Sequence, residues 1–291
     1  ADELSSEIGD FVGWQIRFGK KVSSNTVVKV MTDGLLLSEI NNDNFLTKYK
    51  VIILDEAHER SLNIDFLLGY LWSIRDRRPD LKVIVTSATI DTQKFSKFLS
   101  ESPIIKVPGR SFPVEIKYLD DNELDVDQDR LIVNRILEID DFSHDGDVLV
   151  FLSSEREIRE TEYLLKKAKL FSWEILPLFS RLSTNEQNRI FIDSKKRRII
   201  LSTNIAETSV TVPNIRFVID TGKVRISRYS FRSKIQRLPI ESISRASADQ
   251  RAGRSGRTMP GICYRLYTQN DYDDRSAYTD PEILRTSLAS V

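Results

Sequence analysis

Short apolar runs rich in β-branched residues alternate with longer segments of helical period along the 291 residues of this chain. In the first half, the pattern predicts strands at 26–31, 51–54 and 83–86 and a helix at 64–74. In the second half, it predicts strands at 147–152, 173–178, 198–202 and 217–220 and helices at 129–139, 155–169 and 184–192. Such alternation is typical of a parallel sheet covered by helices, so we expect an α/β fold with ligands at the carboxyl ends of the strands.

Two prolines and a glycine interrupt the alternation at Pro108, Gly109 and Pro113, and a similar alternation follows. The chain is long enough for two domains, and the two halves look like one fold repeated. We therefore expect a first domain over residues 1–108, a hinge at 109–115 and a second domain over residues 116–291.

Composition excludes several classes of protein. The 43 basic and 43 acidic side chains cancel, so the net charge alone does not indicate a nucleic-acid binder. Cys263 is the single cysteine and there are two histidines, which excludes an internal disulfide and leaves too few ligands for a structural zinc site. Because no long apolar run or signal-peptide pattern is present, we expect a cytoplasmic protein without a membrane partner.

The charges are nevertheless segregated locally. Residues 120–129 carry six acids and no base, which is typical of a solvated loop. Residues 223–237 carry six bases and no acid, interleaved with Tyr229 and Phe231. This basic segment predicts nucleic-acid contact, and the alternative is an ordinary exposed hairpin.

Two adjacent carboxylates, Asp55 and Glu56, end the apolar run at 51–54, which we interpret as a buried strand. This arrangement can hold Mg²⁺ on a nucleotide through Asp55 and orient or deprotonate the attacking water through Glu56. The same pair could instead cap a helix N-terminus, and the two residues alone leave both alternatives open.

The longer pattern resembles a known family. Asp55-Glu56-Ala57-His58 resembles the DEAH box of superfamily-two RNA helicases, and Ser87-Ala88-Thr89 resembles motif III at the end of the next strand. Further along, residues 202–211 resemble motif V and residues 250–257 resemble motif VI, in the family's order. In amino-acid sequence, the chain is most similar to the bacterial HrpA branch of this family.

This resemblance implies two RecA-like parallel-sheet domains in tandem, the first truncated at its N-terminus. It also implies ATP or another NTP with Mg²⁺ in the cleft between them, and single-stranded or structured RNA across both. The expected activity is that of a monomeric motor that couples NTP hydrolysis to translocation along RNA or to its unwinding.

Motif VI suggests how hydrolysis would depend on the second domain. A spacing of three with small residues between predicts Arg254 and Arg257 on one helical face, with Gln250 one turn earlier. Guanidinium groups suit the spread negative charge of a phosphoryl-transfer transition state. The resemblance assigns that role to both arginines and places Gln250 near the γ-phosphate; the alternative is a salt-bridged helix face.

Other roles are implied only by the resemblance. Nucleotide contacts are assigned to Ser209, Thr211 and Phe191, although an apolar helix residue such as Phe191 usually lies in the core. The coupling of nucleotide state to domain motion is assigned to His58, Ser87 and Thr89. RNA contacts are assigned to Arg17, Phe18, Thr32, Asp33, Ser153, Thr203 and Asn204, with helix capping as the alternative for polar residues at strand ends.

The family's Walker A loop ends in Gly-Lys-Thr, and this tripeptide does not occur in the sequence. We expect that loop to precede the chain and further domains to follow it, so that the chain alone is deficient in ATP hydrolysis. The competing interpretations are an RNA-binding module without turnover and a DNA-directed helicase, since backbone tracking need not read the 2′-hydroxyl.

Overall fold

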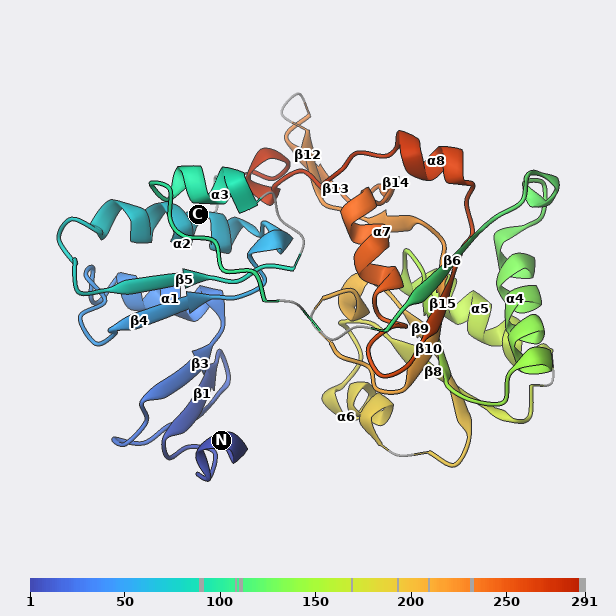
Figure 1. Ribbon diagram of the computed structural model, residues 1–291, viewed down its shortest axis with the longest axis horizontal. Coiled ribbons are helices and arrows are strands. Elements are labelled where there is room, and N and C mark those ends of the chain that lie inside the picture. The colour runs from blue at the N-terminus through green and yellow to red at the C-terminus, as the bar shows by residue number, and fades with distance from the viewer. Residues whose placement is uncertain are drawn as a thin grey trace. The chain divides into compact units, whose positions relative to one another are not determined.

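The computed structural model describes residues 1–88, 92–107, 109, 112–168, 170–192, 194–208, 210–230 and 233–287 (Figure 1). The chain forms two compact units. The first contains Ala1–Ile104 and Pro281–Leu284, and the second contains Ile105–Asp280 and Arg285–Ser287. Of the expected hinge region, Pro108, Arg110 and Ser111 lie outside the described residues, so the boundary at 109–115 stays a prediction.

The first unit contains two small sheets. In one, β1 (Val12–Ile16) pairs antiparallel with β2 (Gly19–Lys21) and parallel with β3 (Val28–Met31). In the other, β4 (Val51–Leu54) pairs parallel with β5 (Lys82–Val85). The helices are α1 (Asp33–Ile40), α2 (Leu62–Ile74) and α3 (Thr92–Phe98), and the short 3-10 turns are η1 (Asp2–Leu4), η2 (Ala57–Glu59) and η6 (Glu282–Leu284). The strands at 26–31, 51–54 and 83–86 and the helix at 64–74 are confirmed to within a few residues, whereas β1 and β2 were not predicted.

The interpretation of β4 as a buried strand is wrong for half of its residues. Ile52 and Leu54 are buried, but Val51 and Ile53 are 48% and 60% exposed. Successive side chains of a strand point to opposite faces, and the core formed with α1 and α2 covers one face only. An uninterrupted apolar run therefore did not mean burial on both faces.

The second unit is built on one six-stranded parallel sheet with the strand order β6-β15-β10-β7-β9-β8. Its strands are β6 (Val114–Tyr118), β7 (Asp147–Phe151), β8 (Trp173–Leu178), β9 (Arg197–Ser202), β10 (Ile215–Asp220) and β15 (Gly261–Arg265). The helices are α4 (Gln128–Phe142), α5 (Glu155–Lys167), α6 (Thr184–Asn188), α7 (Arg245–Ala252) and α8 (Gln269–Asp274). Two further 3-10 turns are η4 (Arg189–Phe191) and η5 (Asn204–Ala206), and η3 (Asp121–Glu123) lies in the acidic segment. The predicted α/β fold is confirmed.

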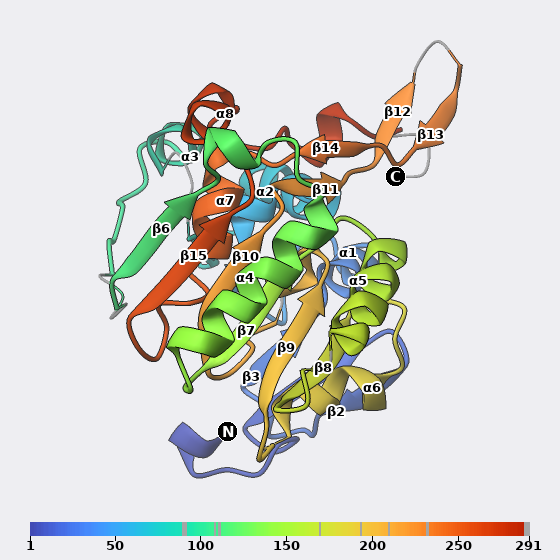
Figure 2. The ribbon, with the colours of Figure 1, turned by 90° about the vertical axis from the view of Figure 1, so that its right-hand side faces the viewer.

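Helices cover both faces of this sheet, and each face has its own apolar core. Ile132 and Ile136 of α4 and Ile158 of α5 pack on one face, where Figure 2 shows the two helices in front of the strands. Ile190 and Ala252 pack on the opposite face. Cys263 of β15 is fully buried in this second core, and burial raises the pKa of its thiol. None of the described helices is long and apolar enough to span a membrane.

The basic segment forms a hairpin in two parts, which extends beyond residue 237. Whether it contacts nucleic acid stays a prediction. Its base pairs β11 (Lys223–Arg225) with β14 (Ile240–Ser242), and its outer part pairs β12 (Arg228–Ser230) with β13 (Ile235–Arg237). Both ladders are antiparallel. Phe231 and Arg232 lie outside the described residues.

A glycine at the end of β10 allows a close approach that no other residue permits. Gly222 has a φ of +70°, and a Cβ there would lie 2.5 Å from the ring of Tyr267 and 2.6 Å from the guanidinium of Arg275. We expect Gly222→Ala to lower the free energy of unfolding of the second unit by about 2 kcal/mol or more, measured by urea denaturation. Gly69→Ala is the control, because no atom lies within 4 Å of its Cβ and alanine favours the helix by roughly 0.5–1 kcal/mol. Equal stability of the two variants would contradict this prediction.

Candidate functional site

The two carboxylates of the DEAH sequence stand on a tight turn at the end of β4. The carboxylate of Asp55 accepts hydrogen bonds from the Thr86 hydroxyl and, at 2.9 Å, from the Glu56 backbone N–H. Glu56 has a φ of 54°, and its side chain is 45% exposed. The next residue, Ala57, donates its N–H to the Thr86 carbonyl at 3.0 Å. The end of β5 therefore fixes the turn that presents both carboxylates.

Helix capping does not account for these carboxylates. Ser61 is the N-cap of α2, and its hydroxyl accepts from the Ile64 N–H at 3.3 Å. Glu56 precedes the 3-10 turn η2, but its side chain makes no capping hydrogen bond. The structure therefore contradicts the alternative in which Asp55 and Glu56 serve to cap a helix.

The donor set fits a magnesium ion that arrives with a nucleotide. Mg²⁺ is usually held by one or two carboxylates together with phosphate oxygens and water. Asp55 and Glu56 supply two carboxylates, and within the described ranges no group of three or more His, Cys, Asp or Glu could hold a metal. An ion held by protein ligands alone is therefore not indicated among these residues.

His58 lies beside the carboxylates and is almost fully buried. Its Nδ1 lies 3.3 Å from the Ala88 N–H nitrogen and 3.3 Å from a carboxylate oxygen of Glu56. The hydrogen bond from the Ala88 N–H requires an Nδ1 without a proton, whereas a hydrogen bond to Glu56 requires a proton on Nδ1. The two contacts therefore require different tautomers. Nε2 is buried without a partner among the described residues. The coupling role assigned to His58 stays a prediction, as does that of the exposed Ser87, and Thr89 lies outside the described residues.

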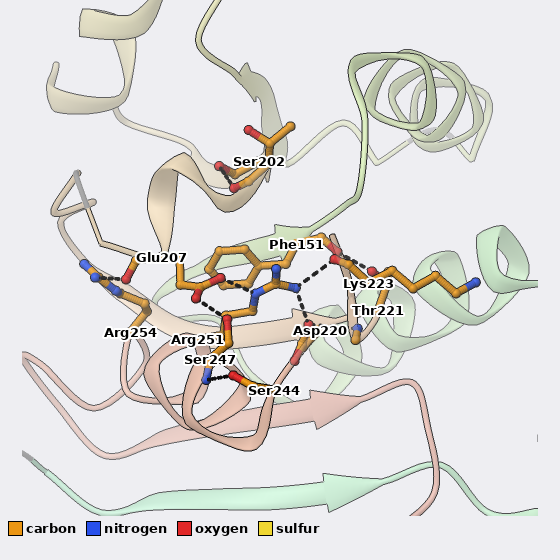
Figure 3. Close-up of polar contacts among 12 residues, drawn as sticks. Phe151, Ser202, Glu207, Asp220, Thr221, Lys223, Ser244, Ser247, Arg251 and Arg254 are labelled. Atoms are coloured by element: carbon orange, nitrogen blue, oxygen red, sulfur yellow. Dashed lines mark hydrogen bonds and ion pairs between the residues drawn. The ribbon is translucent and has the colours of Figure 1, made fainter. Parts of the chain in front are cut away.

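A buried arginine ties the motif V and motif VI segments of the second unit together (Figure 3). The fully buried Arg251 of α7 donates to Glu207 at 2.8 Å and to Asp220, at the end of β10, also at 2.8 Å. The same guanidinium donates to the Lys223 carbonyl at 3.2 Å and lies 4.8 Å from the centre of the Phe151 ring. Burial alone would lower the pKa of Arg251, but the two carboxylates raise it above its ordinary value. The cation is therefore permanent.

The prediction that Arg254 and Arg257 share a helical face is wrong, because α7 ends at Ala252. After the helix, a Cβ on Gly256 would lie 2.7 Å from the Phe112 carbonyl oxygen. The chain must therefore turn and pack closely there, and glycine both permits this approach and disfavours a continued helix.

The two arginines consequently have different surroundings. Arg254 is 8% exposed, and its guanidinium donates to the carbonyls of Glu207 and, at 3.3 Å, Val210. Arg257 is exposed and donates to the Thr211 hydroxyl at 2.6 Å. No carboxylate within the described ranges forms an ion pair with Arg257. Arg254 thus shapes the motif V loop, while Arg257 presents its charge to solvent.

The residues assigned to RNA in the first unit are accessible. Arg17 and Phe18 lie at the tip between β1 and β2, where Phe18 is 90% exposed and the guanidinium stands 5.2 Å from its ring centre. Thr32 precedes α1 without a side-chain capping bond. A groove of about 830 Å³ is lined by Thr32, Asp33 and Asp55 among other residues. The structure therefore brings Thr32 and Asp33, which are assigned to RNA, and Asp55, which is assigned to Mg²⁺, to one groove.

The assigned RNA contacts of the second unit differ in accessibility. Ser153 is 5% exposed, and its N–H and hydroxyl donate to the Glu157 carboxylate at 2.9 and 2.6 Å. Its donors are thus used locally, which favours the capping alternative over a phosphate contact. Thr203 and the exposed Asn204 begin the turn η5, and the Thr203 N–H donates to the Leu178 carbonyl at 3.2 Å. Their hydroxyl and amide side chains lie at the carboxyl end of the sheet.

Phe191 is not a core residue. Its side chain is 51% exposed at the end of η4, whereas the preceding Ile190 is buried. The exposed ring is compatible with the assigned stacking on a nucleotide base, which stays a prediction. Ser209 lies outside the described residues.

The basic hairpin contains one arginine that is used structurally. Arg228 pairs with Glu241 at 2.8 Å and with Asp280 at 3.1 Å. Hydrogen bonds to these carboxylates raise the pKa of Arg228, and Arg228 in turn lowers the pKa of Glu241. By contrast, Lys234 and Arg237 are exposed and take part in no ion pair among the described residues. They are the better candidates for phosphate contact.

The comparisons with known proteins agree with these motifs. Residues 129–259 match the family model described as the helicase conserved C-terminal domain. Over its whole length, the chain is 57% identical to the ATP-dependent RNA helicase HrpA of Escherichia coli strain K12. The chain belongs to the HrpA-like DEAH-box helicases. It is also 43% identical over its whole length to the ATP-dependent RNA helicase HrpA of Borreliella burgdorferi.

Solved structures extend this agreement to the fold. The E. coli DExH-box NTPase HrpB matches 99% of this HrpA-like chain with 35% identity and a TM-score of 0.85. A crystal structure of the E. coli DEAH/RHA helicase HrpB matches with a TM-score of 0.87, also over 99% of the chain. The chain spans 23% of E. coli HrpA, 36% of the Borreliella protein, and 36% and 37% of the two HrpB chains.

Removing Arg251 should destabilise the second unit more than removing an exposed charge does. Arg251→Met leaves Glu207 and the fully buried Asp220 without their cation, and breaking such a buried pair costs about 3–5 kcal/mol. Urea denaturation of the second unit should show this loss. Arg225→Met, at an exposed position of β11, should change stability by less than about 0.5 kcal/mol. A small effect of Arg251→Met would show that the ion pairs are not essential.

Proposed function

We propose that this chain is the motor core of an ATP-dependent RNA helicase, in which NTP hydrolysis drives translocation along RNA or its unwinding. The observation that carries this proposal is that three charged groups of motifs II and VI, those of Asp55, Glu56 and Arg257, lie in defined turns and remain accessible to solvent. Asp55 and Glu56 cap no helix, and Arg257 has only a hydroxyl as its partner among the described residues. Exposed charge on a rigid support is what phosphoryl transfer requires.

In the proposed reaction, these residues have distinct roles. Asp55 would hold Mg²⁺, and the ion would supply neutralisation of the phosphate charge. Glu56 orients the attacking water and accepts its proton. Arg257 stabilises the charge that develops on the transferred phosphoryl group, and Gln250 contacts the γ-phosphate. Arg254 contributes chiefly by holding the motif V loop, because its guanidinium binds the carbonyls of that loop.

The proposed RNA contacts use the accessible residues of both units. Phe18 offers an exposed ring for base stacking, and Arg17, Thr32, Asn204 and Thr203 offer groups for the sugar-phosphate backbone. Such contacts carry little sequence information, so we expect a sequence-tolerant motor that accepts several nucleoside triphosphates. RNA is proposed as the substrate in preference to DNA because the relatives are named RNA helicases. A cytoplasmic, monomeric protein remains part of the proposal.

Hydrolysis is the first test of this function. The full-length protein should hydrolyse ATP faster when RNA is present, and Glu56→Gln should reduce the rate by about 10²-fold or more because the water loses its base. The 291-residue chain alone should be nearly inactive, since it has no Gly-Lys-Thr sequence to hold the phosphates. Phosphate release measured with and without RNA decides both points. Full activity of Glu56→Gln would refute the assigned mechanism, and robust turnover by the chain alone would refute the expected deficiency.

The hairpin provides a second test, in which strand separation is compared with hydrolysis. Lys234→Ala and Arg237→Ala should each weaken RNA binding and lower the slope of log K against log salt by about 0.7, because each removes one phosphate contact. Hydrolysis at saturating RNA should survive while unwinding falls. Arg228→Ala is the matched control, since this arginine is occupied by Glu241 and Asp280 and should leave the salt slope unchanged. If Arg228→Ala lowers the slope as much as the other two variants do, the assignment of phosphate contacts to Lys234 and Arg237 rather than to Arg228 is wrong.

A further inference from the structure

The turn that carries the carboxylates is bounded by two residues in an unfavourable backbone conformation. Glu56 and Arg60 have φ values of 54° and 49°, and the 3-10 turn Ala57–Glu59 lies between them. A left-handed conformation at a non-glycine residue persists only where surrounding contacts enforce it. The contacts at both ends of the turn therefore decide where Asp55 and Glu56 point.

The entrance to the turn is fixed by its neighbour strand. The Ala57 N–H donates to the Thr86 carbonyl at 3.0 Å, and the Thr86 hydroxyl donates to Asp55. These bonds connect β4 with the end of β5. They hold the side of the turn on which the carboxylates lie, but they do not reach Arg60.

The exit from the turn is fixed by a residue far along the chain. The backbone N–H of Glu282 donates to the Arg60 carbonyl at 2.9 Å, and its carboxylate accepts from the Leu62 N–H, also at 2.9 Å. Glu282 begins the short turn η6, which packs against α2 within the first unit. One residue thus binds both the last residue of the strained turn and the first residue of the following helix.

The position of this carboxylate is favourable for a second reason. The first N–H groups of a helix have no partner inside the helix, and the helix dipole places partial positive charge there. Ser61 satisfies the N–H of Ile64, and Glu282 satisfies that of Leu62. Arg60 is also held by Asp65 of the same helix, with nitrogen–oxygen distances of 2.7 and 3.1 Å. Arg60 is therefore clamped between α2 and η6.

We propose that Glu282 is a positioning residue for hydrolysis, which holds the exit of the Glu56–Arg60 turn so that Asp55 and Glu56 keep their productive orientation. This inference rests on the proposed function, because it assumes that these carboxylates carry the reaction. The influence of Glu282 passes through the Arg60 carbonyl and the N-terminus of α2.

The test uses the full-length protein with saturating RNA. Glu282→Leu has a similar size but no acceptor, so it should lower kcat for ATP about tenfold and change KM by less than about twofold, since misplaced catalytic groups cost rate more than binding. Glu282→Gln keeps an oxygen that can accept from the Leu62 N–H, and it should restore kcat to within about threefold of wild type. Glu3→Leu is the control for loss of an acid in the same unit, because Glu3 is exposed and its side chain makes no hydrogen bond or ion pair within the described residues.

A second variant examines the same hydrogen bond from the donor side. Leu62→Pro removes the N–H at the first helical position, where proline is well tolerated, and Ser61 before it already has the extended conformation that proline requires. It should lower kcat as Glu282→Leu does. The double variant should be no slower than either single variant, because both remove one interaction.

The outcomes separate this inference from the proposed function. If the wild-type protein shows no RNA-stimulated hydrolysis, the proposed function fails. If the wild-type protein is active and folded Glu282→Leu and Leu62→Pro retain wild-type kcat, the positioning role of Glu282 is overturned. Equal losses of rate in Glu282→Leu and Glu282→Gln would also overturn it, because the acceptor would then be irrelevant. If Glu282→Leu does not fold, Leu62→Pro and Glu282→Gln decide the question alone.

Discussion

The pairing of one buried cation with two carboxylates organises the second unit. Arg251 is fully buried, so its charge is tolerable only because Glu207 and Asp220 surround it. Each partner belongs to a different segment: Glu207 to the loop after β9, Asp220 to the end of β10, and Arg251 to α7. None of the three segments can move alone without leaving a buried charge unpaired. This constraint gives the loop residues Thr203, Asn204 and Thr211 a fixed support.

In the first unit, the functional side chains are positioned without a buried ion pair. Its carboxylates lie at the surface, where no buried charge compels an arrangement, and backbone hydrogen bonds define the turn instead. The Thr86 carbonyl holds Ala57, and Glu282 holds Arg60. The orientation of these carboxylates therefore depends on residues outside the turn itself.

The sequence predicted what is decided locally. The strand at 51–54, the strand at 173–178 and the helix that follows the DEAH sequence were found because apolar period and β-branched composition are properties of short windows. The polar residues at strand ends were found for the same reason. The end of α7 was missed because a helical spacing of arginines said nothing of the close backbone contact that Gly256 makes with Phe112.

Interactions between residues that are far apart in the sequence could not be predicted either. Nothing in the spacing of residues showed that Arg251 would pair with Asp220, or that Glu282 would bind the start of α2, because such pairs depend on the assembled fold. One signal was present: Asp220 ends an apolar strand, and a buried carboxylate requires a cation. The exposure of Val51 and Ile53 could not be predicted for a different reason. An apolar run indicates a strand, but it does not show whether one face of the sheet or both faces are covered.

The single cysteine has a practical consequence. Cys263 lies within the sheet core, and burial raises the pKa of its thiol, so little thiolate is available to alkylating reagents. We therefore expect the thiol of Cys263 to react only slowly with maleimide dyes. A cysteine introduced at an exposed position in each unit would be labelled selectively, and fluorescence energy transfer between the two dyes would report the distance between the units.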